Sequence, residues 1–227
     1  MSKHDSSKLK AGSVELTHHD FMNMSQCARM VVVRSALWTL KTRHEDEKLG
    51  VHGNISPKTL YLNEGEICLL APTTEDNENA YKPVEHFRQE SQQITKQSDI
   101  YALGAVFYEL ITGTAPPKAD QRGLAKKDFY NPLSSHKEPK EAFPPQLLTS
   151  VDKALSLEKE DRWASANTWR QEFSISENDE LRGINELLCL QLSRVKHSPS
   201  WIRNWVERPL MILGALALIG ILVAALV

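Results

Sequence analysis

The run Leu210–Val227, at the end of the sequence, contains no polar side chain. A helix over this run would extend roughly 27 Å at about 1.5 Å per residue, close to the roughly 30 Å thickness of bilayer hydrocarbon. Because hydrocarbon offers the backbone no hydrogen-bond partner, such a run inside a membrane has to be helical. A buried core helix is the alternative, although cores seldom need so long a charge-free run. We therefore expect a transmembrane helix over residues 209–227.

The residues before this run predict its orientation. They include Trp201, Arg203, Trp205 and Arg208. Tryptophans favour the membrane interface and arginines favour the cytoplasmic side, so the bulk of the chain is expected in the cytoplasm. Met1–Lys10 is polar and charged, unlike a signal peptide. The prediction is a tail-anchored, single-pass membrane protein.

Small residues share one face of the predicted span, at Gly214, Ala217, Gly220 and Ala224. Such a face lets two helices approach closely, which would permit a homodimer through the transmembrane helix. Because Gly and Ala are common in membrane spans without this role, both interpretations stay open.

The composition is that of a folded, core-bearing protein. Hydrophobic residues make up 41% of the chain, and 27 Lys and Arg against 29 Asp and Glu give a formal net charge of -2. This balance offers no general attraction to polyanions, so no nucleic-acid partner is expected. Cys27, Cys68 and Cys189 form no close pair, which argues against a disulfide framework or a zinc site and favours a reducing compartment.

The remaining chain is predicted to be mainly helical. Apolar residues recur with helical spacing from Phe21 to Leu40, with Asp20 as N-cap. A short β-hairpin is expected where Tyr61–Leu62 and Ile67–Leu70 flank a polar turn. Asp99–Thr112 is apolar on nearly all sides, which is typical of a helix at the centre of a domain. Further helices are predicted over Leu147–Leu157, Ala164–Phe173 and Ile184–Val195, the last leading toward the membrane.

The most specific patterns are Ser98–Pro116 (SDIYALGAVFYELITGTAP), His52–Leu62 (HGNISPKTLYL), Tyr81–Glu85 (YKPVE) and Glu160–Ala166 (EDRWASA). These four patterns resemble, respectively, the central helix, the catalytic loop, the end of the activation segment and the PxxRxxSA-like turn of one family. That family is the C-terminal lobe of bacterial eukaryotic-like Ser/Thr protein kinases. The resemblance implies a mainly α, protein-kinase-like C-lobe with a small β-hairpin.

The expected organisation has four parts. Residues 1–15 form a disordered N-terminus, residues 16–174 the kinase-like C-lobe, residues 175–208 a helical juxtamembrane linker and residues 209–227 the transmembrane helix. No GxGxxG or VAIK-like run occurs, so the family's N-terminal lobe is expected to be missing. The resemblance places the protein in a bacterial inner membrane.

The positions at which this family performs phosphoryl transfer hold other residue types here. The reaction needs a carboxylate base and oxygen ligands for magnesium. The base position holds Asn54, and Ser56 replaces the lysine that contacts the phosphate. Thr59 stands at the metal-binding asparagine, and the DFG position begins with Ala71. The resemblance therefore implies a pseudokinase with no catalytic residue, no cofactor and no metal.

The positions that the family uses for architecture are retained. Asp99 matches the aspartate that accepts hydrogen bonds from the catalytic loop, which would offset the cost of burying its carboxylate. Glu85 and Arg162 match the ion pair that ties the activation segment to the later helices. His52 is interpreted as a structural anchor of its loop rather than as an acid or base.

Two other clusters offer metal-ligand types. Glu75, Asp76 and Glu78 follow the DFG position, but a solvated acidic loop is the favoured interpretation. His18 and His19 are adjacent, so their side chains point apart and suggest a surface pair.

These observations predict a membrane-tethered pseudokinase that acts as a non-catalytic binding module, scaffold or regulator in phospho-signalling. Without an N-lobe, the surface around Phe21–Leu40 and Leu69–Leu70 is expected to be exposed and to dock a kinase, a phosphatase or an N-lobe-like protein. Three alternatives stay open: a Ser/Thr protein kinase subunit completed in trans by a partner chain, a structural component of a membrane complex, and chance retention in a decaying gene fragment.

Overall fold

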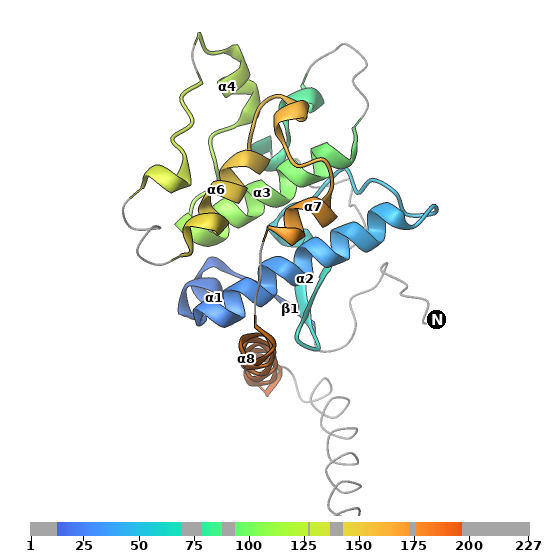
Figure 1. Ribbon diagram of the computed structural model, residues 1–227, viewed down its shortest axis with the longest axis vertical. Helices are drawn as coiled ribbons and strands as arrows, with labels where there is room; N and C mark the ends of the chain where they lie inside the picture. The colour runs from blue at the N-terminus through green and yellow to red at the C-terminus, as the bar shows by residue number, and fades with distance from the viewer. Residues whose placement is uncertain are drawn as a thin grey trace, which may run out of the picture.

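The most apolar helix of the sequence, α3 (Lys96–Thr112), runs through the middle of the computed structural model (Figure 1). It begins after Thr95, whose backbone N–H donates to Ser98 Oγ at 3.0 Å, and it ends at Gly113, which has a φ of 78°. This left-handed conformation favours glycine and stops the helix. Most of α3 is buried, as predicted for a central helix.

The structure describes residues 13–69, 79–87, 94–126, 128–136, 143–172 and 176–196. Strand β2 (Leu60–Asn63) pairs antiparallel with β1 (Val14–Glu15) and with β3 (Glu66–Leu69). The predicted hairpin is therefore present, and its turn uses Glu64 and Gly65 at positive φ. Strand β1 was not expected, because two residues carry no recognisable alternation.

The predicted helix Phe21–Leu40 is in fact two helices, α1 (His18–Asn23) and α2 (Gln26–Glu45). Met24 is extended, and Ser25 caps α2 by accepting from Ala28 N at 3.2 Å. Helix α2 also continues to Glu45, beyond the helical spacing that ends at Leu40, because His44 in its last turn makes a buried contact with Asp99 of α3.

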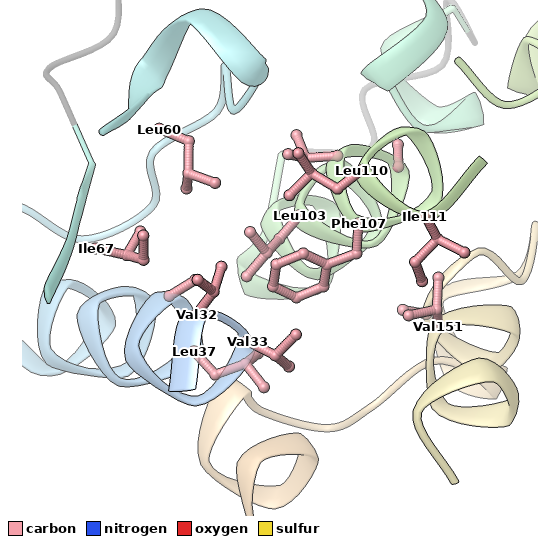
Figure 2. Close-up of a cluster of buried hydrophobic side chains, with 14 of the residues drawn as sticks. Val32, Val33, Leu37, Leu60, Ile67, Leu103, Phe107, Leu110, Ile111 and Val151 are labelled. Carbon is pink, nitrogen blue, oxygen red and sulfur yellow. The ribbon is translucent and has the colours of Figure 1, made fainter. Parts of the chain in front are cut away.

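The remaining helices surround this centre. The hydrophobic core lies between α3 and its neighbours. Its α3 side chains include Leu103, Phe107 and Ile111, which project toward Val33 of α2 and Val151 of α6 (Figure 2). The other elements of this part are α4 (Ala119–Leu124), α6 (Pro145–Ala154), α7 (Ala166–Gln171) and the 3₁₀ turns η1 (Pro57–Thr59), η2 (Asn79–Tyr81), η3 (Val84–His86), η4 (Leu133–Ser135) and η5 (Lys159–Asp161).

Helix α8 (Glu177–Lys196) packs on the body instead of leading away from it (Figure 1). Leu187 is fully buried, and Gly183 lies so close to α2 that a Cβ there would stand 2.7 Å from Val31 and 2.8 Å from the carbonyl of Cys27. The α2 surface that was expected to be exposed is therefore partly covered by the chain's own α8.

The predictions of a transmembrane helix, a tail anchor and an inner-membrane location are corrected. No helix among the described residues has both the length and the apolarity to cross a bilayer. Helices α2 and α8 have 20 residues each but carry many charges, whereas α3 is apolar but has 17 residues and forms the core. The run Leu210–Val227, including Gly214 and Gly220, lies outside the described residues.

The contact between α3 and α6 can be tested by exchanging two small residues. A Cβ on Gly104 would stand 2.9 Å from Cβ of Ala154. Gly104→Ala should therefore lower the free energy of unfolding, since overpacking typically costs about 1–3 kcal/mol. Ala154→Gly in the same chain should restore much of this loss, and a urea double-mutant cycle measures the coupling. Strictly additive effects would contradict the close approach.

Candidate functional site

The carboxylate of Asp99 in α3 holds the loop that follows α2. Its Oδ2 accepts from the backbone N–H of His52 at 2.7 Å, and its Oδ1 accepts from Gly53 N at 2.7 Å. His44 Nε2 lies 2.8 Å from Oδ2, and it donates because a carboxylate only accepts. The Asp99 side chain is 1% exposed, so these donors replace the water that burial removes.

His44 was not identified as a site residue from the sequence. It lies in the last turn of α2, beyond the helical spacing recognised from Phe21 to Leu40. Its side chain is only 4% exposed because it reaches α3 across the core. No local pattern distinguishes His44 from its charged neighbours, since the contact with Asp99 spans 55 positions.

His52 and Asn54 stand next to each other in this loop. His52 is buried, and its Nδ1 accepts from the backbone N–H of Asn54 at 3.3 Å. Asn54 occupies the position predicted for a catalytic base, and a carboxamide does not take up a proton at neutral pH. The geometry therefore gives His52 an anchoring contact and gives Asn54 no basic atom.

Ser56 and Thr59 bond to each other across η1. The backbone N–H of Ser56 donates to Thr59 Oγ1 at 3.0 Å, and that hydroxyl donates to the Ser56 carbonyl at 2.8 Å. Both residues are buried. The Thr59 hydroxyl, at the position predicted for a metal ligand, is thus engaged with the backbone of its own loop.

Glu85 in η3 and Arg162 after η5 form a buried, two-pronged ion pair. Arg162 Nη1 donates to Oε1 at 2.8 Å and Nη2 to Oε2 at 3.0 Å, and the side chains are 0% and 1% exposed. Ser98 Oγ also donates to Oε1 at 2.7 Å. Further donors of Arg162 reach the carbonyls of Ser156, Leu157 and Gln97. The pair joins η3 to the start of α3 and to the segment before α7.

These contacts change the acidity of Glu85. Burial by itself would raise the pKa of Glu85, but the hydrogen bonds and charge of Arg162, with the hydroxyl of Ser98, bring that pKa below its ordinary value. Glu85 is therefore ionised at neutral pH and the ion pair is fully formed.

A small pocket lies between the loop and η3. It is lined by Gly53–Ile55, Tyr81–Pro83 and His86, with Ser98, Asp99 and Ala102 beneath, and its volume of about 10 Å³ suits roughly one water molecule. His86 Nε2 donates to the carbonyl of Gly53 at 3.3 Å. Burial lowers the pKa of His86, and the bond to Gly53 offsets part of that effect, so His86 is neutral at pH 7. This pocket alone does not hold a nucleotide.

The adjacent histidines of the sequence have separate partners. His18 Nδ1 contacts the carbonyl of Leu110 at 3.0 Å, whereas His19 contacts Asn23. Among the described residues, no group of His, Cys, Asp and Glu could hold a metal ion. Ala71 and the acidic residues 75–78 lie outside them.

Removing the Asp99 carboxylate should destabilise the domain. Asp99→Ala leaves three donors without their acceptor, and we expect a loss of about 3–5 kcal/mol in the free energy of unfolding, by analogy with breaking a buried ionic contact. Asp99→Asn, which keeps one acceptor oxygen, should lose less. Urea unfolding measures both, with the exposed Asp161→Ala as control. An Asp99→Ala variant as stable as the control would contradict the anchoring role.

Acid should weaken the Glu85–Arg162 pair in a defined direction. Because the pKa of Glu85 is lower in the folded chain than its ordinary value of 4.5, its stabilisation is complete above that pH and is lost as the pH falls through the folded pKa. The free energy of unfolding, followed from about pH 7 to about pH 3, should fall less steeply in Glu85→Gln than in the wild type. The exposed Glu172→Gln should follow the wild type. Parallel curves for wild type and Glu85→Gln would refute this account.

Comparison with known proteins places the chain near bacterial kinases. No protein-family model matches it. It is 23% identical over 151 residues to the serine/threonine-protein kinase PknH of Mycobacterium bovis, which covers 60% of this chain and 25% of PknH. It is 26% identical over 115 residues to the serine/threonine-protein kinase PknD of Protochlamydia amoebophila, covering 48% of this chain and 11% of PknD. The chain thus spans a quarter or less of these relatives.

A solved structure supports the fold. The apo form of PpkA-294 superposes with a TM-score of 0.56 at 24% sequence identity, covering 68% of this chain and 56% of that one. At this identity the likeness concerns the fold alone. The chain is therefore a distant homologue of bacterial Ser/Thr protein kinases with a kinase-like fold.

Proposed function

We propose that this kinase-related chain is a pseudokinase, a non-catalytic binding module in phospho-signalling. The observation that carries the proposal is the state of the loop His52–Thr59. Its backbone is held by Asp99, whereas its side chains at the functional positions are an amide and hydroxyls. The contacts that hold the loop in place are retained, whereas the side chains that phosphoryl transfer needs are replaced.

Phosphoryl transfer relies on groups that these positions do not supply. A carboxylate has to accept the proton of the attacking hydroxyl, and metal ions have to bridge the phosphates. Asn54 cannot take up that proton, and Thr59 Oγ1 already serves its own loop. Among the described residues, Asp99 places a carboxylate beside this loop, but both of its oxygens accept hydrogen bonds from the protein. Its role is thus to position the loop.

The same contacts suit a surface that recognises a protein. The loop and η3 are fixed relative to each other, because Asp99 holds one and the Glu85–Arg162 pair holds the other. A rigid surface loses little conformational entropy when it binds a partner. The partner class that we propose is a protein of phospho-signalling, such as a kinase or a phosphatase.

Nucleotide binding by the full chain tests the proposal. Thermal unfolding with and without millimolar ATP and Mg²⁺ should give the same midpoint, since binding stabilises only a protein that has the site. An active bacterial Ser/Thr kinase serves as positive control. A Mg²⁺-dependent rise in the midpoint that Asn54→Ala abolishes would overturn the pseudokinase proposal, and so would transfer of labelled phosphate to a protein substrate.

A further inference from the structure

The imidazole of His86 connects two segments that lie far apart in the sequence. Its Nε2 donates to the carbonyl of Gly53 at 3.3 Å, across 33 positions, and so joins η3 to the loop His52–Thr59. We call this contact the His86 joint. Both segments also line the small pocket above Asp99. A change at His86 therefore acts on the loop and on η3 at the same time.

The other ring nitrogen of His86 restricts the ring to its neutral form. Nδ1 is buried, and no described residue offers it a hydrogen-bond partner. In the neutral ring Nδ1 is an acceptor, whereas in the protonated ring it becomes a second N–H donor. A charged, buried donor without an acceptor costs far more free energy than a neutral, unpaired acceptor. The closed joint therefore disfavours the imidazolium.

The charged groups around His86 do not compensate for this cost. Glu85 and Asp99 attract a proton to the ring, but Glu85 is paired with Arg162, and both oxygens of Asp99 already accept hydrogen bonds. Lys82, just before η3, repels a positive ring, and the loop presents a neutral carbonyl to it. Burial outweighs the two carboxylates and lowers the pKa of His86. A ring that has left this position therefore binds a proton more readily.

We propose that the His86 joint is a pH-sensitive device, which holds the loop His52–Thr59 against η3 at neutral pH and releases it in mild acid. Because the closed position lowers the pKa of His86 from its ordinary value of 6.5, the stabilisation is complete above that pH and is lost as the pH falls below it. The loss begins well above 4.5, the ordinary pKa of Glu85, so the ion pair of Glu85 is still formed when the joint opens. The joint belongs to the fold and does not rest on the proposed function.

Hydrogen exchange of the full chain tests the joint. The backbone amides of residues 52–59, followed by mass spectrometry and corrected for the intrinsic effect of pH, should exchange severalfold faster at about pH 5.5 than at about pH 7.5. The limit is about tenfold, which is reached when only the open form binds the proton. A corrected rate that changes by less than about twofold would overturn the proposal.

Two variants separate the joint from a general effect of acid. His86→Gln keeps a side-chain donor for the Gly53 carbonyl but does not take up a proton, so its corrected exchange should not rise in acid. His19→Gln removes an exposed histidine of α1 and should behave like the wild type. Circular dichroism at neutral pH verifies that both variants fold. A rise in His86→Gln as large as that of the wild type would refute the role of His86.

The His86 ring provides a second and independent measurement. In NMR spectra of the histidine ring protons, the His86 signal is the one that His86→Gln lacks. Its titration midpoint should lie below 6.5, because burial opposes the charge. A midpoint at or above 6.5 would contradict the proposal, whatever the exchange rates show.

Discussion

The burial of one carboxylate, that of Asp99, is the constraint on which the central arrangement depends. A charge inside the core is tolerated only when donors surround it, and here the donors come from a loop and from the last turn of α2. Helix α3 therefore fixes where α2 ends and where the loop His52–Thr59 begins. The Glu85–Arg162 pair extends the same principle to η3, since Ser98, whose hydroxyl also donates to the Glu85 carboxylate, is next to Asp99 in the chain.

The elements that could be predicted are those whose signal is local. Helix α3 is apolar on nearly all sides and closes at Gly113, and the hairpin has a polar turn, so both follow from short-range patterns. The break between α1 and α2 was missed because Ser25 is an N-cap only if Met24 leaves the helix. The expected membrane helix was wrong, because no helix among the described residues is long and apolar enough to cross a bilayer.

The site residues also fall into those that the sequence identified and those that only the folded structure reveals. Asp99, Glu85 and Arg162 were named from a resemblance, whereas His44, Ser98 and His86 reach their partners only through tertiary packing. The surface of α2 that was expected to be open is partly covered because the carboxylates and the glycine of α8 fit the N-terminal half of that helix. Complementarity of this kind between distant segments cannot be predicted from the hydrophobic periodicity of either segment.

The contact of Arg194 with the carbonyl of Glu15, 3.2 Å away, joins two residues separated by 179 positions. During synthesis, β1 and α1 leave the ribosome long before α8 exists, and domains generally form as the chain emerges. The segment around Glu15 therefore gains its hydrogen bond from Arg194 only after α8 has been synthesised. The N-terminal edge is completed only then, and a nascent chain halted before α8 lacks the contact of Arg194 with Glu15.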